Sequence, residues 1–494
     1  MSTAISDFSP VIAVDRRTNK PLHTQVYEAF RAAILGRNLR PGQKVPSSRS
    51  LASELNISRI PVLTAYSQLI AEGYFETRTG AGTFVSSSLP DQWISVPQQH
   101  AAVPTGLRSG RRLISRRLAA LPEFRGRPWQ NKWGPFVVGQ VAFEHFPVEA
   151  WSRLINRHVR NARVNSFHYG EPMGSHALRS TIADYLRTAR AVNCDASQIM
   201  IVSGSQQALE LCACALLDPG DHVWLEEPGY AAGRSAFALA GCRLVPVPVD
   251  AEGLDVSAGT ELSRKARAVF VTPSHQFPLG VTMSASRRLQ LLEWAQRSGA
   301  WIIEDDYDSE YRYESMPIAS LQGLDRHSRV IYIGTFSKTL FPSLRLGYLV
   351  IPPDLVGRFA TVRHSMDLCA PNLYQSVLTD FIAEGHFARH IRRMRVVYSE
   401  RRNALAEAIR SVFHSSVEVL GAQAGMHLVI TLPRRVRDLS VCERASLVDL
   451  WLWPLSTCYV GSASRQGLVL GFGSTTARQM TNAVQKLRDV VQDR

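Results

Sequence analysis

From about Trp129 to the end of the chain, strand-like apolar runs alternate with amphipathic helical segments, and this alternation constrains the fold more than any other feature. The seven runs are QIMIVSG, DHVWLEEP, CRLVPVPVD, ARAVFVTP, GAWIIEDD, RVIYIGTFSK and LRLGYLVIP. Apolar strands separated by helices are typical of an α/β fold with a mostly parallel sheet. Ligands bind such sheets at the carboxyl ends of the strands, so the residues after each run form the candidate site.

The amino-terminal part of the chain carries most of the net charge. The 494 residues have a formal net charge of +14, and residues 1–127 hold 17 Lys and Arg against 8 Asp and Glu. A basic segment of this kind favours a polyanionic partner such as the phosphate backbone of DNA. The length suits two or more domains, so we expect the two parts to perform different tasks.

The overall composition excludes several classes of protein. Hydrophobic residues make up 45% of the chain and charged residues 20%, which is unlike a disordered or collagen-like chain. No long uncharged apolar run and no signal-peptide pattern is present, so we expect a cytoplasmic protein that does not contact a membrane. The seven cysteines contain no Cys-x-x-Cys pair, which favours free thiols and no metal site.

Residues 21–87 show the pattern of three helices followed by a hairpin. The first helix starts at Pro21 and is ended by Pro41-Gly42, the second is capped by Ser47, and the third follows Ser58. The residues expected to face inward are Val26, Phe30, Ala33 and Ile34 in the first helix and Val62, Tyr66, Leu69 and Ile70 in the third. The alternating stretch YFETRTGAGTFVSS then predicts a β-hairpin with a glycine-rich turn.

These residues resemble the winged helix-turn-helix of the GntR family of bacterial transcription regulators. The resemblance is carried by PLHTQ, LRPG, PSSRSLA, SRIPVLTAYSQL, EGY and GAGTFV. It implies that the third helix enters the major groove of double-stranded DNA and that the hairpin turn lies near the minor groove. The residues that it assigns to DNA are Arg49, Ser58, Arg59, Thr64, Arg78, Gly80 and Gly82. The sequence departs from the family pattern at Val45 and Pro61.

Two strand ends in the larger part of the chain carry polar residues at positions where a ligand can bind. Gly204, Ser205 and Gln206 lie between a strand and a helix, where free N–H groups and the helix dipole form a phosphate site. Asp305 and Tyr307 lie at the end of a strand expected to be buried. A carboxylate there is costly to bury unless it meets a cation or a donor.

Two further strand ends complete the set. His275 and Gln276 follow one strand, while Ser337, Lys338 and Arg345 follow another. Lys338 is the one lysine of six that follows a strand in apolar surroundings. Such surroundings lower the pKa of an amine and favour its reaction with an aldehyde.

Together these residue types suit pyridoxal 5′-phosphate (PLP), which needs a lysine, an acid for its pyridine nitrogen, a donor to its phenolic oxygen, an aromatic side chain and a phosphate cradle. Their order resembles the fold-type I aminotransferases. The resemblance implies that Lys338 is the Schiff-base lysine, Asp305 the partner of the pyridine nitrogen and Tyr307 the partner of the phenolic oxygen. It further assigns Tyr230 to the ring and Gly204, Ser205, Gln206, Ser337 and Arg345 to the phosphate. Either His275 or Gln276 takes the place of the usual asparagine.

A GntR-type head joined to an aminotransferase-like domain resembles the MocR subfamily of GntR-type regulators. We therefore expect an amino-terminal tail (1–20), a winged helix-turn-helix (21–87), a basic, proline-containing linker (88–128) and an aminotransferase-like PLP domain (129–494) that ends in a smaller α+β subdomain. The resemblance implies a homodimer that binds an operator and whose affinity for DNA responds to PLP or to its adduct with an amine or amino acid.

Two points stay open at this level. Aminotransferases place an arginine for the substrate carboxylate near the last core strand; the nearest candidate is Arg465, whereas Val469 occupies the position used in some families. An effector without a carboxylate therefore remains possible, as does PLP itself. The alternative function is a catalytically active aminotransferase with an accessory DNA-binding domain, because a sensor and an enzyme use the same lysine, aspartate and tyrosine.

Overall fold

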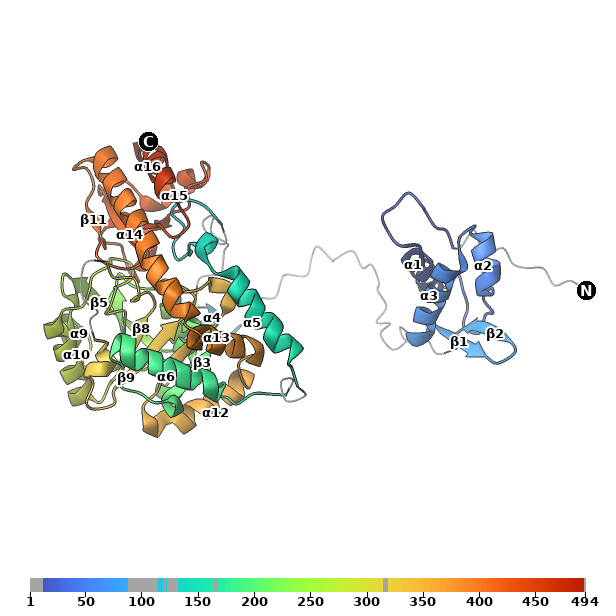
Figure 1. Cartoon of the computed structure of the whole chain (residues 1–494), viewed down its shortest axis with the longest axis horizontal. Coiled ribbons are helices and arrows are strands. Elements are labelled where there is room, and N and C mark those ends of the chain that lie inside the picture. Colours follow the sequence, from blue (N-terminus) through green and yellow to red (C-terminus); the bar gives the residue numbers. More distant parts are fainter. Residues whose placement is uncertain are drawn as a thin grey trace, which may run out of the picture. The chain divides into compact units, whose positions relative to one another are not determined.

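The computed structural model describes residues 12–87, 114–119, 121, 132–163, 168–313 and 319–492. The chain divides into two compact units, Met1–Arg112 and Leu113–Arg494. Each unit has its own apolar core. Most of the expected linker (88–128) lies outside the described residues, and each unit is therefore considered by itself (Figure 1).

The amino-terminal unit consists of three helices and a two-stranded hairpin, as predicted. The elements are α1 (Leu22–Leu35), α2 (Ser48–Glu54), α3 (Arg59–Ala71), β1 (Phe75–Arg78) and β2 (Gly82–Val85). β1 and β2 pair antiparallel, with Phe75 opposite Val85. The rings of Phe30, Tyr66 and Phe75 meet edge to face at 5.2–5.5 Å between centroids and form the centre of this core.

Three details of this unit differ from the expectation. α1 ends at Leu35 rather than near Pro41, because Arg37 adopts a left-handed conformation (φ 59°) and the N–H groups of residues 36–38 bond back to carbonyls of the last turn. The prediction that Ile70 faces inward is wrong: it is 37% exposed, and Ala65 is buried instead. Within the expected tail, Ile12 is fully buried in the same core.

The helix caps of this unit follow from single residues. The Ser47 hydroxyl accepts from the N–H of Ser50 at 3.1 Å and caps α2. Ser58 is the N-cap residue of α3 but makes no side-chain cap hydrogen bond. Pro61 occupies the third helical position and lacks the N–H that such a cap would bond.

The larger unit is built on an eight-stranded sheet with the order β3-β10-β9-β8-β7-β4-β5-β6. All seven apolar runs of the sequence form strands in it. Their bounds are β3 (Ile199–Val202), β4 (His222–Glu227), β5 (Arg243–Asp250), β7 (Ala266–Val271), β8 (Trp301–Asp306), β9 (Val330–Thr335) and β10 (Gly347–Val350), with β6 (Gly253–Leu254) at the edge. The sheet is mostly parallel, but β10 runs antiparallel to both β3 and β9.

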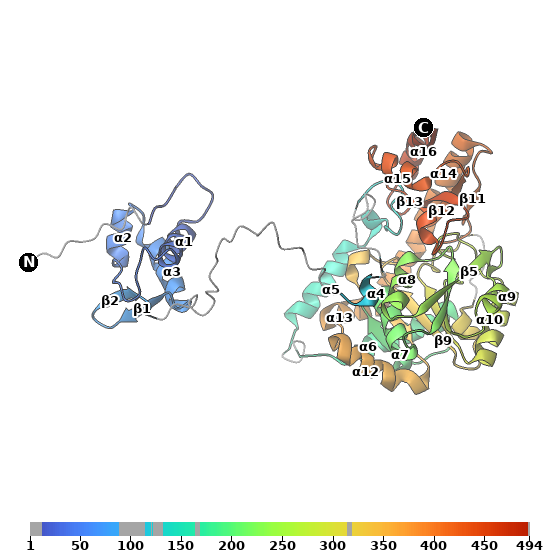
Figure 2. The ribbon, with the colours of Figure 1, turned by 180° about the vertical axis from the view of Figure 1, so that it is seen from behind.

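Helices cover both faces of this sheet (Figures 1 and 2). One core cluster joins one face to α7 (Ser205–Leu216), α8 (Ala231–Leu239) and α12 (Val356–Asp367). Two other clusters join the opposite face to α5 (Val148–Arg160), α6 (His176–Arg190), α10 (Ala285–Ser298), α13 (Asn372–Ala383) and α14 (His386–Phe413). Short helices complete the unit: α4 (Arg116–Ala119), α9 (Val256–Leu262) and α11 (Leu321–Leu324).

The carboxyl-terminal part forms the smaller α+β subdomain. Its antiparallel sheet has the order β11-β12-β14-β13. The elements are β11 (Val419–Leu420), β12 (His427–Leu432), α15 (Asp438–Ser446), β13 (Trp453–Pro454), β14 (Gln466–Gly471) and α16 (Ala477–Gln492). None of the described helices is both long enough and apolar enough to cross a membrane.

Candidate cofactor site and DNA-binding surface

A cavity of about 250 Å³ opens at the carboxyl ends of the parallel strands in the larger unit. Because β10 is antiparallel, its first residue, Gly347, lies at this same edge, and Arg345, two residues earlier, lines the cavity. The predicted cofactor residues that line the cavity are Ser205, Gln206, Tyr230, Asp305, Tyr307, Ser337, Lys338 and Arg345. The sheet thus brings together residues separated by up to 140 positions.

Lys338 and Asp305 have the electrostatic properties that a Schiff-base site needs. Burial lowers the pKa of Lys338 below its usual range, and the nearby carboxylates of Asp308 and Asp305 offset part of that effect. Its Nζ donates to the carbonyl of Gly139 at 3.3 Å. Burial raises the pKa of Asp305 to about 7, although the Ser205 hydroxyl donates to its carboxylate at 3.3 Å. An uncompensated buried carboxyl group is ready to accept a hydrogen bond from a cationic ring nitrogen.

The phosphate end of the cavity is formed by the start of α7 and the loop before β10. Gly204 is the N-cap residue of α7 with φ 106°, and the first N–H groups of a helix lack partners within it. A Cβ atom at Gly204 would lie 3.4 Å from Nη1 of Arg345, which places that guanidinium in contact distance of the helix end. The buried Oε1 of Gln206 has no hydrogen-bond partner. The N–H groups at the start of α7 and the Arg345 guanidinium are donors that fit a phosphate, and together with Lys338 and Asp305 they fit PLP.

Tyr230 and Tyr307 lie on the walls of the cavity. Burial raises the pKa of Tyr230 to about 12, so its hydroxyl stays neutral. The Tyr307 hydroxyl donates to the carbonyl of His275 at 2.9 Å. Phe277 contacts both tyrosines, with ring centroids 5.7 Å from Tyr230 and 6.4 Å from Tyr307.

Neither His275 nor Gln276 is among the residues that line the cavity. Both side chains are buried, and the amide of Gln276 holds the loop together by donating to the carbonyls of Pro228 and Phe277 at 2.8 and 2.7 Å. Phe277, the next residue, lines the cavity instead. Spacing alone did not indicate which side chain of this loop lines the cavity.

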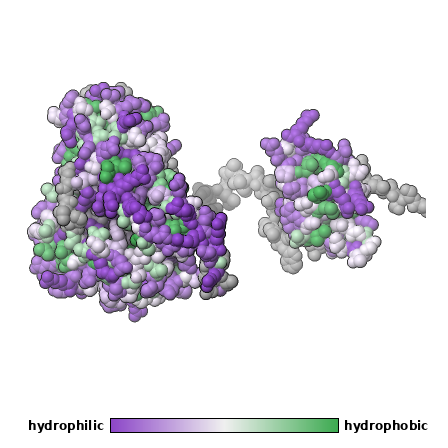
Figure 3. All heavy atoms as spheres, in the orientation of Figure 1, coloured by the Kyte–Doolittle hydropathy of each residue, from purple (hydrophilic) through white to green (hydrophobic). Residues whose placement is uncertain are grey.

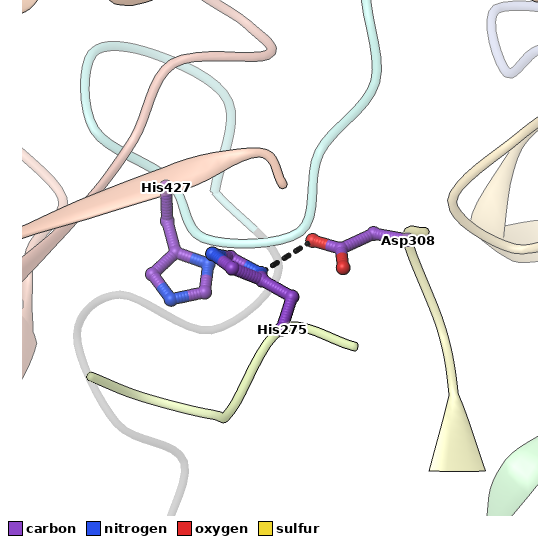
Figure 4. Close-up of side chains that lie close together, drawn as sticks. All are labelled: His275, Asp308 and His427. Carbon is purple, nitrogen blue, oxygen red and sulfur yellow. Dashed lines mark hydrogen bonds and ion pairs between the residues drawn. The ribbon is translucent and has the colours of Figure 1, made fainter. Parts of the chain in front are cut away.

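His275 lies between Asp308 and His427 in a buried cluster beside the cavity (Figure 4). Its Nδ1 is 3.1 Å from both Asp308 Oδ2 and the Tyr307 hydroxyl oxygen. His427 Nε2 lies 2.9 Å from the carbonyl of Pro278, to which it can donate. Ligand atoms of these three residues lie within 4.8 Å of one another and could hold a metal ion, but the hydrogen bonds already occupy one nitrogen of each histidine.

Arg465 lies apart from the residues that line the cavity. It is exposed in the segment before β14. The cavity residues that were not predicted as ligands include Asp308, His427 and Trp453. Asp308 belongs to the acidic stretch after β8 and could have been chosen from the sequence. His427 and Trp453 come from the distant subdomain, and no local signal marks them.

The residues predicted to bind DNA are all exposed on the amino-terminal unit. Arg59 donates to the hydroxyl of Ser48 at 3.1 Å, and Thr64 donates to the carbonyl of Ile60 at 3.1 Å. The Arg78 guanidinium pairs with Glu76 at 2.6 Å and lies over the ring of Phe84. Gly80 and Gly82 have φ angles of 75° and 114°, as the hairpin turn requires.

Arg49 and Ser58 are exposed as well, and α3 also carries exposed apolar side chains. Ile60 is 74% exposed and Leu63 is 41% exposed on α3. Figure 3 shows hydrophobic side chains among hydrophilic ones on the face of this unit turned to the viewer. A groove lined by α3 residues such as Leu63 and by the hairpin turn separates the helix from the wing. Exposed arginines beside such a helix are suited to contacts with phosphates and base edges.

Comparisons with known proteins agree with both units. Residues 133–484 match the family described as aminotransferase class I and II, and residues 22–85 match the bacterial regulatory proteins of the gntR family. A kynurenine aminotransferase of Pyrococcus horikoshii, solved with PMP, superposes with a TM-score of 0.71 and 28% identity over 77% of this chain and 97% of its own. The fold and the site therefore define a GntR-type head joined to a fold-type I aminotransferase-like domain.

Relatives that share both units identify the family. The probable rhizopine catabolism regulatory protein MocR of Rhizobium meliloti is 39% identical over 97% of this chain and 95% of its own length. The pyridoxine biosynthesis regulator PdxR of Corynebacterium glutamicum is 30% identical over 97% and 98%. The chain belongs to the MocR subfamily of GntR-type transcription regulators. The family favours regulation over the alternative of an aminotransferase with an accessory DNA-binding domain.

Proposed function

We propose that this chain is a PLP-dependent transcription regulator that binds an operator as a homodimer in the cytoplasm. Its aminotransferase-like unit senses PLP, or an amine or amino acid joined to it, and this changes the affinity of the winged helices for DNA. A two-fold symmetric dimer matches paired operator half-sites.

One observation carries this proposal: a single chain combines a basic winged helix with a cavity in which Lys338, Asp305, Tyr307 and a phosphate-binding helix end converge. A cavity of this kind without the winged helix would indicate an enzyme. A winged helix with a degenerate cavity would indicate a regulator that does not use the cofactor. The combination supports a ligand-responsive regulator.

PLP supplies an aldehyde to which a primary amine can attach covalently. Lys338 provides such an amine, and its lowered pKa increases the neutral fraction that reacts. Asp305 would hold a proton on the pyridine nitrogen, and Tyr307 would contact the phenolic oxygen. Arg345 and the N-terminus of α7 would hold the phosphate. An effector amine that competes with Lys338 for the aldehyde would change the charge and the contacts inside the cavity.

The first experiment measures the absorbance spectrum of the full chain titrated with PLP. Wild type should show a visible band that depends on Lys338, and Lys338→Ala should lack it. Lys265→Ala is the matched control, because Lys265 is an exposed lysine of the same unit. A band that survives in Lys338→Ala would contradict the cofactor site.

The second experiment measures binding to duplex DNA. Sequences selected from a random duplex pool by the PLP-loaded chain should bind with a strong salt dependence. Arg59→Ala should weaken binding, whereas Arg358→Ala, an exposed arginine on α12, should not. Multiple turnovers with an amino donor and a 2-oxo acid, without any effect of the amine on DNA affinity, would instead favour an aminotransferase.

A further inference from the structure

The cavity holds two cationic side chains, and the cofactor accounts for both. Among the described residues that line it, Lys338 and Arg345 are the only lysine and arginine. Lys338 would carry the cofactor, and Arg345 lies at the phosphate end beside Gly204. A bound amino acid would need a third cation for its own carboxylate, because an unpaired charge is costly to bury.

The wall formed by the carboxyl-terminal subdomain is uncharged. Trp453 lies edge-on to Phe277 with 6.3 Å between ring centroids, and Phe277 lies 5.3 Å from the ring of His427. Burial, together with the neighbouring His275, lowers the pKa of His427 to about 3, so its imidazole is neutral at pH 7. This wall therefore offers no positive charge to an anionic group.

The strand expected to supply a carboxylate partner carries an apolar residue instead. Val469 on β14 is fully buried in a cluster with Val429 and Leu455. It pairs directly with Trp453 of β13, a residue that lines the cavity. Arg465, four residues earlier, is exposed and does not line the cavity.

Asp308 adds a negative charge at the same place. It lines the cavity, is 1% exposed, and its Oδ1 has no hydrogen-bond partner. Its other oxygen, Oδ2, lies 3.1 Å from His275 Nδ1. A free carboxylate oxygen repels an anion but accepts a hydrogen bond from an ammonium or hydroxyl group.

We propose that the effector is a primary amine without a carboxylate, whose remaining surface is apolar or carries hydroxyl groups. This inference rests on the proposed function and narrows the class of its effector. The amine reaches the aldehyde at the Lys338 end of the cavity. Its uncharged part lies against Phe277 and Trp453, and any hydroxyl group on it can donate to Asp308.

The test compares pairs of compounds that differ by one carboxylate. Tyramine with tyrosine and ethanolamine with serine are titrated into the PLP-loaded full chain, and the shift of the Lys338-dependent absorbance band is followed. Each amine should half-saturate the shift at a concentration at least about tenfold below that of its amino acid, because an unpaired buried charge costs more than 1.4 kcal/mol. The amines should also change the affinity for the selected duplex DNA more strongly.

Two variants should reverse this preference by adding a cation. Trp453→Arg places a guanidinium at the cavity wall, and Val469→Arg places one on the adjacent strand. At least one of them should lower the half-saturating concentration of the amino acid relative to its amine. Trp453 is half-buried, so its variant tests the inference even if the fully buried position of Val469 does not tolerate arginine. Lys265→Ala should keep the wild-type preference.

The outcomes separate this inference from the proposed function. If the Lys338-dependent absorbance band is present and amino acids shift it at concentrations equal to or below those of the matched amines, this result overturns the inference alone. Selective loss of amino-acid binding in Arg465→Ala does the same. A chain whose DNA affinity follows PLP concentration, with no response to any amine, also overturns it. The absence of any Lys338-dependent band overturns both proposals.

Discussion

Replacing Asp305 by asparagine should change the pH dependence of stability by an amount that follows from the burial of its carboxyl group. Asp305 is 4% exposed, and burial raises its pKa from 3.8 to about 7. At about 1.36 kcal/mol per pKa unit, this shift corresponds to roughly 4 kcal/mol. Because the pKa is higher in the folded state, the stabilising contribution is full below pH 3.8 and is lost as the pH rises through about 7.

The assay is denaturant unfolding of the cofactor-free full chain at a series of pH values between about 4 and 8, with the transition of the larger unit compared between wild type and Asp305→Asn. The stability of the variant relative to wild type should rise by roughly 4 kcal/mol across this range. Glu304 and Glu310 also have pKa values raised to about 7 by burial, but they are present in both proteins and cancel in the difference.

If the difference in unfolding free energy between wild type and Asp305→Asn does not change with pH, the reasoning is refuted, because the carboxylate then ionises without a burial penalty. PLP provides an internal control. Its protonated nitrogen would give wild-type Asp305 a cationic partner, so adding PLP at pH 8 should stabilise wild type more than the variant.

Three further predictions test other parts of the molecule. Phe30→Ala removes the central ring of the amino-terminal core and should lower the free energy of unfolding of that unit by about 3–5 kcal/mol. The variant should therefore lose DNA binding but keep the Lys338-dependent absorbance band, and titrations of one preparation with DNA and with PLP would show both. Gly425→Ala should weaken PLP binding at unchanged helix content by circular dichroism, because the added Cβ would lie 2.0 Å from Cε1 of His275 on a backbone with φ 75°; unchanged affinity would contradict this. Replacing thymine by deoxyuridine in the selected duplex should weaken binding by wild type but not by Ile60→Ala, because the exposed Ile60 side chain is suited to contact thymine methyl groups.

The sequence predicted the strands of the larger unit well, because each is a short apolar run bounded by polar residues. It did not indicate that β10 runs antiparallel. A run that is buried on both faces has the same pattern in either direction, so its orientation depends on long-range pairing with β3 and β9. The early end of α1 was also missed, because the left-handed turn at Arg37 involves no glycine or asparagine at that residue.

The sequence places residues together in one cavity where their chemistry and their position after a strand coincide. Lys338, Asp305 and Tyr307 all follow strands, and the sheet brings them to one cavity. The prediction was incomplete where the side chain depends on the path of a loop, as at Phe277, or comes from the other sheet, as for His427 and Trp453. A single sequence without aligned relatives carries no signal for such contacts between distant segments.

The antiparallel course of β10 has a consequence for how this site varies in evolution. One loop leaves β9 after Thr335, carries Lys338 and Arg345, and returns into the sheet at Gly347. Lys338, the proposed Schiff-base lysine, and Arg345, the proposed phosphate-binding residue, are therefore separated by the length of a single segment that is fixed to the sheet at both ends. Insertion or deletion of one residue there would move one group relative to the other. We therefore expect relatives that keep both functions to keep the length of this loop, and gaps in their alignment to fall elsewhere.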